Sequence, residues 1–346
     1  MVILEKIFVA AAFFTHPVGS IATIGINNPR PGQKSLAVTD ASAIVLKSFD
    51  SKLFVINRGA TSTIQAIDPI TFKILGNYSV GSFSNPQDLV VANDKAYISR
   101  YDAHLSSGNT DDLWVVDPLT GDFLTGFNFK PFMTSDGEQL ARASKMALAG
   151  NTLYVLLQDL SAAYKATTNG KVAVIDTTTD TLVKIISLAG RNPTGIVYSA
   201  GLDRLFVTDT GLFDDFFNND TSTAFGGIEE IDPNSNTTNG IVLDDLDFGG
   251  YLYSIILISD TRAIVTIDAK TVAAFNPTTM QVLDTSLYTT GGGFLPEITA
   301  DKNGFVWIPE RNPKNSGMVL IDPSSGAVIA GPLPVGALPT SMTFMQ

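Results

Sequence analysis

The chain has 346 residues and a formal net charge of −12 at pH 7, with 45% hydrophobic residues, 16% charged residues and a mean hydropathy of +0.20. This composition excludes a disordered chain, and the acidic balance argues against nucleic acid as a partner, because the phosphate backbone would be repelled. The sequence has no cysteine and only two histidines, His16 and His104, which excludes disulfide frameworks, cysteine-ligated metals, a cysteine nucleophile and a histidine-rich metal site within one chain.

The N-terminal stretch from Ile7 to Phe14 is apolar and has two interpretations. It resembles the apolar part of a signal peptide. However, the only charges before it, Glu5 and Lys6, cancel, and no small-residue cleavage site follows closely. We therefore favour a β-strand from Lys6 to Phe13 and a chain that has already lost its targeting segment. No apolar run of about 18 residues or more occurs, so no transmembrane helix is expected.

One pattern then repeats along the chain: an apolar strand, a turn, a strand of the type K-L-F-V, a polar loop, a strand ending in I-D-P or a variant, and a last strand. We predict the second strands at 52–57, 95–100, 152–158, 204–209, 262–268 and 304–310. We predict the third strands, with the turns that follow them, at 64–71, 113–121, 172–180, 228–235, 272–279 and 318–326. Alternating apolar and β-branched residues between turn formers are typical of strands, and no segment shows sustained helical periodicity. The fold class is therefore all-β.

The Asp and Asn residues that end the third strands are interpreted as turn formers. An Asp side chain accepts backbone hydrogen bonds from two residues further on, and a following Pro presets φ for the turn. These residues are Asp68, Asp117, Asp176, Asp232, Asn276 and Asp322. Their regular spacing resembles a ring of carboxylates, but their position indicates a structural role.

The repeats predict a seven-bladed β-propeller with four antiparallel strands per blade, forming a single domain over residues 1–346. A sheet of four short strands buries both faces only when it packs against neighbouring sheets in a ring. Six blades are expected at 41–80, 86–130, 144–188, 193–247, 251–288 and 296–334. The seventh combines residues 338–346 with 5–39, so that both ends of the chain close the ring and remove the open edges.

With these strands placed, the chain resembles the YVTN-type, YncE-like family of seven-bladed β-propellers. The best stretches are Asn85 to Asp102, Lys171 to Tyr198 and Gly226 to Pro233, while the signature tetrapeptide reads LFVI, AYIS, LYVL and LFVT. The resemblance covers nearly the whole chain and implies an exported protein, located in the periplasm, on the cell surface or outside the cell. The resemblance does not identify a reaction, because one fold can host many functions.

Three long insertions mark one face of the predicted propeller. They lie between second and third strands, at 101–111, 159–170 and 210–225, in consecutive blades. Insertions on a common face usually mark the binding side. The candidate contact residues on this face are Asn57, Arg58, Asn85, Arg100, Tyr101, His104, Gln158, Asp159, Arg191, Asn192, Asp209, Phe216, Phe217, Glu297, Glu310 and Arg311.

The arginines of this face have two interpretations. They can bind a carboxylate or phosphate through paired hydrogen bonds, or they can form a structural network with acids such as Asp102 and Asp159. We expect a non-catalytic protein that binds a protein partner or a small anionic ligand, without a cofactor. One alternative is a lactonase-like hydrolase or lyase with Ca²⁺ bound by oxygen ligands at the channel mouth, from Asn85, Asp88, Asn192 and Glu297. Another is a structural subunit of an extracellular assembly.

Overall fold

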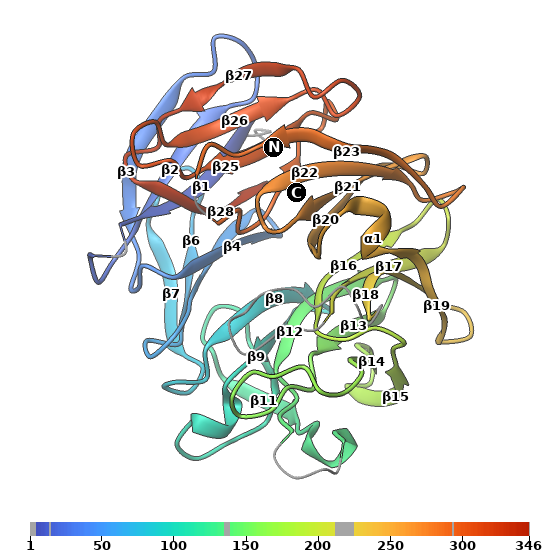
Figure 1. The fold of residues 1–346 in the computed structure, drawn as a ribbon. Helices are drawn as coiled ribbons and strands as arrows, with labels where there is room; N and C mark the ends of the chain where they lie inside the picture. Colours follow the sequence, from blue (N-terminus) through green and yellow to red (C-terminus); the bar gives the residue numbers. More distant parts are fainter. Residues whose placement is uncertain (1–4, 14, 135–138, 212–224, 293, 346) are drawn as a thin grey trace.

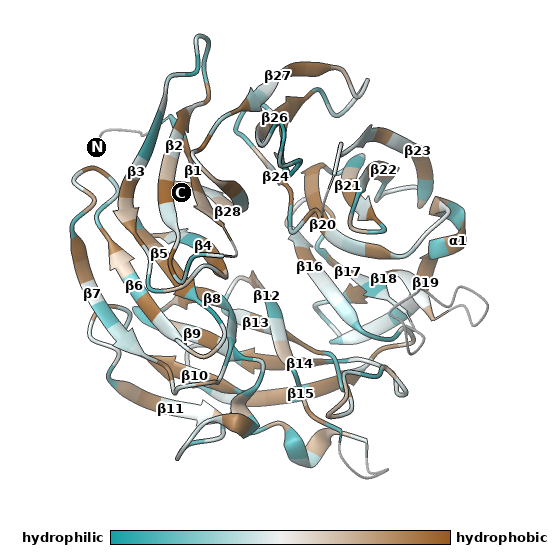
Figure 2. Cartoon of the chain, turned by 60° about the vertical axis from the view of Figure 1, so that its left-hand side comes forward, coloured by the Kyte–Doolittle hydropathy of each residue, from teal (hydrophilic) through white to brown (hydrophobic). Residues whose placement is uncertain are grey.

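The computed structural model describes residues 5–13, 15–134, 139–211, 225–292 and 294–345. The chain forms seven antiparallel sheets of four strands each, arranged as blades around a central axis (Figures 1 and 2). In Figure 2 the first strand of each blade lies nearest the axis and the fourth lies at the periphery. The predicted seven-bladed propeller is thus confirmed.

From the innermost strand outward, the closing blade contains β28 (Leu338–Phe344), β1 (Lys6–Ala12), β2 (Ser20–Gly25) and β3 (Gly32–Val38). In the same order, the next three blades contain β4 (Ile44–Phe49), β5 (Lys52–Asn57), β6 (Thr63–Ile67) and β7 (Ile74–Ser79); β8 (Pro86–Ala92), β9 (Lys95–Arg100), β10 (Leu113–Val116) and β11 (Phe123–Phe127); and β12 (Ala143–Ala149), β13 (Thr152–Leu157), β14 (Lys171–Asp176) and β15 (Thr181–Ser187). The last three contain β16 (Pro193–Ser199), β17 (Arg204–Thr210), β18 (Gly226–Asp232) and β19 (Thr237–Asp244); β20 (Leu252–Ser259), β21 (Arg262–Ile267), β22 (Thr271–Asn276) and β23 (Gln281–Thr289); and β24 (Thr299–Ala300), β25 (Val306–Glu310), β26 (Gly317–Ile321) and β27 (Val328–Leu333).

The helices of the described residues are short. They are α1 (Asp245–Phe248) and the 3-10 helices η1 (Ala103–Leu105) and η2 (Lys130–Phe132). Within the part of the chain that the structure describes, no helix is long and apolar enough to cross a membrane.

The two ends of the chain close the ring, as the sequence predicts. Strand β1 lies between β28 and β2, so that Val9 faces Met342 on one side and Ala22 on the other. Residues Ile7–Ala12 are at most 1% exposed. The apolar N-terminal stretch is therefore an interior strand of the fold.

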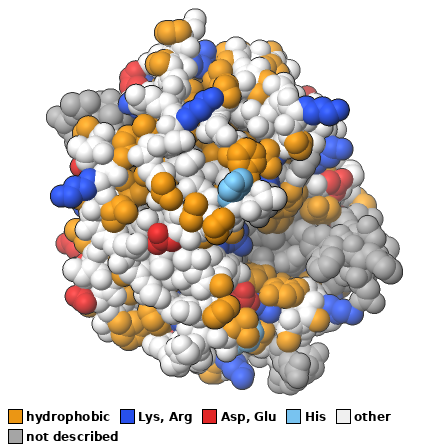
Figure 3. Space-filling model, turned by 90° about the vertical axis from the view of Figure 1, so that its left-hand side faces the viewer, with side chains coloured by type: hydrophobic (Ala, Val, Ile, Leu, Met, Phe, Trp, Pro, Cys, Tyr) orange, Lys and Arg blue, Asp and Glu red, His pale blue; other side chains and the backbone are white. Residues whose placement is uncertain are grey.

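The core consists of apolar layers between neighbouring blades. Phe8 and Ile21 of the closing blade, for example, pack with Leu46 and Val55 of the β4–β7 blade. On its other face the closing blade contributes Ile7, Val9 and Ala22 to a cluster with Trp307 and Met318 of the β24–β27 blade. Because both faces of a blade are covered in this way, stability depends on the ring being complete. On the surface shown in Figure 3, charged side chains lie scattered among apolar and uncharged ones.

The turn role of the I-D-P residues is confirmed. In each of the six turns the side-chain oxygen accepts a backbone N–H from two residues further on, at 2.7–2.9 Å, in Asp68, Asp117, Asp176, Asp232, Asn276 and Asp322. These turns lie on the face opposite the insertions.

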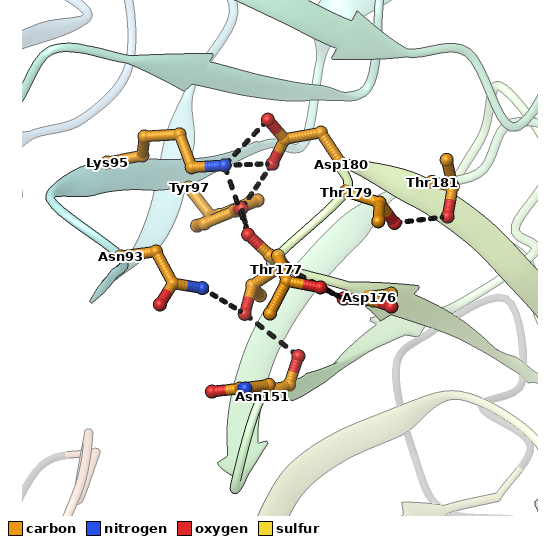
Figure 4. A network of polar contacts seen from close by, with 10 residues as sticks. Asn93, Lys95, Tyr97, Asn151, Asp176, Thr177, Thr179, Asp180 and Thr181 are labelled. Atoms are coloured by element: carbon orange, nitrogen blue, oxygen red, sulfur yellow. Dashed lines mark hydrogen bonds and ion pairs between the residues drawn. The ribbon is translucent and has the colours of Figure 1, made fainter.

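Polar contacts also join blades on this opposite face (Figure 4). Lys95 Nζ contacts both carboxylate oxygens of Asp180 at 2.7 Å, and the hydroxyl of Tyr97 donates to Asp180 Oδ1 at 2.5 Å. Asn93 donates to the hydroxyl of Thr177, which donates to the carbonyl of Asn151. The β8–β11 and β12–β15 blades are thus linked by an ion pair and several hydrogen bonds, which indicates a structural role.

Replacing Asp117 by Ala tests the turn interpretation. Asp117 Oδ1 accepts from the N–H groups of Leu119 and Thr120, both at 2.8 Å. We expect Asp117→Ala to lower the free energy of unfolding by about 1 kcal/mol, measured by urea denaturation, with ligand binding unchanged. Asp117→Asn keeps the accepting oxygen and is the matched control, expected to stay near the wild type. A binding defect with intact stability would contradict the structural role.

Candidate ligand-binding site

The centre of the ring encloses a cavity of about 260 Å³, lined by residues of all seven innermost strands or the loops that lead into them. Its polar and charged lining residues include Lys47 of β4, Asp88 of β8, Lys145 of β12, Tyr253 of β20 and Glu297, which precedes β24. We call this space the channel cavity.

Irregularities in the innermost strands accompany several of these polar residues. The pairing with the neighbouring strand shifts between Pro86 and Asp88, between Ala143 and Met146, between Pro193 and Gly195, and between Leu252 and Ile255. Such bulges redirect side chains. Asp88, Lys145, Thr194 and Tyr253 lie within or at the end of these irregular segments, which explains how polar side chains of short apolar strands come to line the cavity.

Lys47 and Asp88 form a closely paired set in the cavity. Lys47 Nζ lies 2.7 Å from Asp88 Oδ1, and the Asp88 carboxylate also accepts from the N–H groups of Leu89 and Met146 at 2.9 Å. Burial alone would lower the pKa of Lys47, but the charge and hydrogen bond of Asp88 outweigh it, and the pKa is raised. Lys47 therefore stays charged and bound to its partner.

Lys145 differs from Lys47 in lacking a close partner. Its nearest ion-pair partner, Glu297 Oε2, is 3.9 Å away, and none of the described residues forms a hydrogen bond with Lys145 Nζ. Glu297 itself accepts from Ser341 Oγ at 2.5 Å and from the N–H of Met342 at 2.7 Å. Burial lowers the pKa of Lys145; the charges of Glu297 and Asp88 oppose this, and those of Lys47 and Arg58 add to it.

Arg58 directly follows β5, at the insertion-bearing end of that strand, and is not among the residues that line the channel cavity itself. Burial lowers the pKa of its guanidinium, while Tyr253, Tyr101 and Glu297 act in the opposite direction. Its Nε is buried without a hydrogen-bond partner, and it forms no ion pair with any described residue. Two cations (Lys47, Arg58) and two carboxylates (Asp88, Glu297) thus surround Lys145, whose amine adds a positive charge when it is protonated.

Arg142, which the sequence pattern did not single out, organises the rim beside Arg58. Its guanidinium forms an ion pair with Asp102 and lies 4.1 Å from the ring centre of Tyr164 and 5.1 Å from that of Tyr101. The Tyr101 hydroxyl donates to Gln158 Oε1 at 2.6 Å. The inserted loops of two neighbouring blades are thereby joined into one surface. Asn85 belongs to the same network, donating to Asp102 at 2.8 Å and accepting from the N–H of Gly59 at 3.0 Å.

Several predicted contact residues serve the fold instead. Arg100 is fully buried, lies over the Trp114 ring and donates to the carbonyls of Val80, Asn109 and Asp111. The side chain of Asp159 is fully buried and paired with Lys171. Asn57 and Glu310 are also buried, with hydrogen bonds to Ala41 and Gln65 and to Tyr288, Gly291 and Asn312, respectively. The polar atoms of these four side chains are enclosed by protein, and their role as ligand contacts stays a prediction.

The remaining candidates lie around the rim. Arg191 lies 3.8 Å from the ring centre of Phe225, and Arg311 donates to the carbonyl of Phe294 at 3.3 Å. Asn192 is buried and has φ +53°. His104, on η1, is exposed beside a second cavity of about 200 Å³ that Tyr101 and Asp112 also line. Phe216 and Phe217 lie outside the described residues.

A buried pair of acids lies below the rim in the β16–β19 blade. Asp209 and Glu229 are both fully buried. Glu229 accepts from the N–H groups of Ala189 and Gly190 and from the hydroxyl of Thr238. Burial, followed by the adjacent Glu229 carboxylate, raises the pKa of Asp209 well above its ordinary value. The predicted contact residue Asp209 is therefore enclosed within the blade beside Glu229.

This pair predicts a distinct pH dependence of stability. Because the pKa of Asp209 is raised in the folded state, its contribution to stability is present at acidic pH and is lost as pH rises through that pKa. In the wild type this effect makes the free energy of unfolding fall as pH rises above about pH 4. We expect a smaller fall in Asp209→Asn, because the amide has the shape of the carboxyl group but cannot ionise. Urea denaturation from pH 4 to 8 measures it, and Glu229→Gln should act in the same direction. Parallel curves for Asp209→Asn and wild type would contradict this assignment.

The structure brings together only part of the ligand set predicted for Ca²⁺. Of its four residues, Asp88 and Glu297 line the channel cavity, while Asn85 and Asn192 do not. Both carboxylates already face lysines and accept backbone hydrogen bonds. Among the described residues, no group of three or more acids or histidines is placed to hold a metal ion. These residues do not fit a calcium cage as they stand, and Ca²⁺ binding remains a prediction.

Solved structures with the same fold cover nearly the whole chain. The periplasmic gluconolactonase PpgL of Pseudomonas aeruginosa superimposes with a TM-score of 0.66 at 15% identity over 99% of both chains. A Bacteroides uniformis protein provisionally named a 6-phosphogluconolactonase gives 0.67 at 13% identity, over 98% of this chain and 99% of that one. A protein of unknown function from Desulfotomaculum acetoxidans gives 0.64 at 14% identity over 98% of both. At these identities the likeness shows the fold alone.

No protein-family model and no curated protein matches the sequence. Membership of the YncE-like family is therefore not confirmed, whereas the propeller architecture implied by that resemblance is.

Proposed function

We propose that this protein is an exported β-propeller that binds a small anionic ligand where the channel cavity opens to the insertion-bearing face. The observation that carries the proposal is Arg58, a largely enclosed cation without a carboxylate partner among the described residues. An enclosed charge that lacks a partner costs several kcal/mol of desolvation. A bound carboxylate or phosphate would supply the missing partner through charge-assisted hydrogen bonds.

The surrounding charges support the same ligand class. The nearest carboxylate oxygen to Lys145 Nζ, on Glu297, is 3.9 Å away, so a ligand anion can lie closer to this amine. Lys47, in contrast, is already paired with Asp88 at 2.7 Å. The hydroxyl of Tyr253 belongs to the same cavity and can donate a hydrogen bond. The rim, with Tyr101, Tyr164 and Phe225, adds aromatic area for the apolar part of a ligand or for a partner protein.

Export is supported by the periplasmic gluconolactonase among the structural neighbours and by the resemblance to the YncE-like family. A second candidate function, hydrolysis of a sugar lactone at the same cavity, is favoured by two neighbours that bear gluconolactonase names. Its product would be a sugar acid, an anion of the class that the cavity charges favour. The metal-dependent form of this reaction also requires calcium binding, which calcium titration of the metal-free protein would test.

Calorimetric titration with gluconate, 6-phosphogluconate and citrate tests the proposal. We expect at least one anion to bind, and Arg58→Met to raise its Kd more than tenfold, equivalent to about 1.4 kcal/mol. Arg262→Met is the matched control, because Arg262 lies on the opposite face, where it donates to the carbonyl of Pro323. Equal binding by Arg58→Met and wild type would contradict the site. New lactone hydrolysis with any of the corresponding lactones would favour the second function.

A further inference from the structure

We infer that Lys145 is a covalent attachment site, whose amine forms a Schiff base with the carbonyl carbon of a small 2-oxo acid held in the channel cavity. This inference rests on the proposed function and deepens it, because it names the ligand class and the bond that it forms.

The position of Lys145 supports this role. It lies on β12, lines the channel cavity, and its side chain is 32% exposed within the ring of innermost strands. Lys47 is similarly exposed at 29%, but its amine is held by Asp88 at 2.7 Å. No described residue donates to or accepts from Lys145 Nζ, so this amine can approach a ligand without breaking a hydrogen bond.

Burial of Lys145 favours the neutral, nucleophilic amine. An amine attacks a carbonyl only when it is unprotonated, and enclosure beside another cation is a known way to achieve this. Burial lowers the pKa of Lys145, and Lys47 and Arg58 add to the effect against the opposing charges of Glu297 and Asp88. These four groups are the charged neighbours that act on the amine from the surrounding strands and loops.

The same neighbours supply the remaining parts of the reaction. Arg58 would pair with the carboxylate of the 2-oxo acid, which places the adjacent carbonyl carbon toward the amine. The lone pair of Nζ forms the C–N bond, the carbonyl oxygen takes up a proton, and the resulting carbinolamine loses water to give the C=N bond. Glu297, 3.9 Å from Nζ, is placed to accept the proton from nitrogen and return it to the departing hydroxyl. One water leaves, and nothing is oxidised or reduced.

Reductive trapping tests the inference on the intact chain. The protein is incubated with pyruvate, glyoxylate or 2-oxoglutarate and sodium cyanoborohydride, and its peptides are analysed by mass spectrometry. We expect one reduced adduct per chain on the peptide that carries Lys145, with Lys47 unmodified. Lys145→Met and Lys145→Arg should abolish the adduct, and their thermal melting shows whether they remain folded. Arg58→Met should slow adduct formation more than tenfold.

Competition with lactate distinguishes the inference from the proposed function. Lactate carries the carboxylate of a 2-oxo acid but has no keto group that could form a Schiff base. Competition by lactate against trapping at Lys145 would support both. If anions bind and depend on Arg58 but no 2-oxo acid is trapped, the Schiff base is overturned while anion binding stands. Adducts spread evenly over surface lysines, or persisting in Lys145→Met, would also overturn it.

Discussion

Removal of residues 1–12 is expected to leave the protein insoluble, or to lower its free energy of unfolding by several kcal/mol. The deletion takes away β1, which is hydrogen-bonded on both sides, to β28 and β2. Full burial of one Val, Ile or Phe side chain contributes about 1.5–3 kcal/mol, and β1 contributes Ile7, Phe8 and Val9, all fully buried, besides three buried alanines. The loss also creates two open strand edges, which promote aggregation.

Solubility after expression and thermal melting measure this effect. A point substitution tests the same strand in a full-length chain: Val9→Asp places a charge between Met342 and Ala22 and should also be strongly destabilising. A control is Glu5→Gln, since Glu5 precedes β1 and is exposed. A truncated protein that melts like the wild type would contradict closure of the ring by the N-terminal strand.

The second large effect is expected for Arg142→Met, which should lower the free energy of unfolding by about 3 kcal/mol. The substitution leaves Asp102 buried without its ion-pair partner and removes a guanidinium that lies against the rings of Tyr101 and Tyr164. Asn85 still donates to Asp102 at 2.8 Å, so the remaining charge is partly satisfied and the protein should still fold.

A double-mutant cycle with Asp102→Asn isolates the pair. Because the neutral amide no longer needs a cation, the double variant should recover part of the stability that Arg142→Met loses. Urea denaturation of the four proteins gives the coupling energy. Strict additivity would show that Arg142 stabilises the rim through its aromatic contacts rather than through Asp102.

The repeat pattern was sufficient to predict the fold because it is set by local chemistry. The K-L-F-V strands and the turns that begin with Asp or Asn recur along the chain, and hydrogen bonds such as that from the N–H of Ile70 to Asp68 Oδ1 form each turn independently of its neighbours. Closure by β1 followed from the match between KIFVAAAF and the other second strands. These features depend on a few adjacent residues, which a single sequence displays.

The site was harder to predict because it depends on the direction of single side chains. Arg100 and Arg58 both occur at the end of a second strand, yet Arg100 is enclosed by carbonyls, whereas Arg58 has Tyr253, Tyr101 and Glu297 as its electrostatic neighbours. Lys47, Lys145 and Tyr253 were missed because they lie in strands, whereas the insertions lie in loops. The sequence does show a polar residue in several otherwise apolar first strands, and this could have indicated the site. The bulges that turn these residues inward, as between Ala143 and Met146, are visible only once the strands are paired.

The most direct test of anion binding at the channel mouth is a crystal structure of the protein with the tightest-binding anion from the calorimetric series. We predict electron density for the ligand between Arg58 and Lys145, with its acidic group against the guanidinium. Density on the opposite face, at the turns formed by Asp117 or Asp322, with an empty channel mouth, would contradict this prediction.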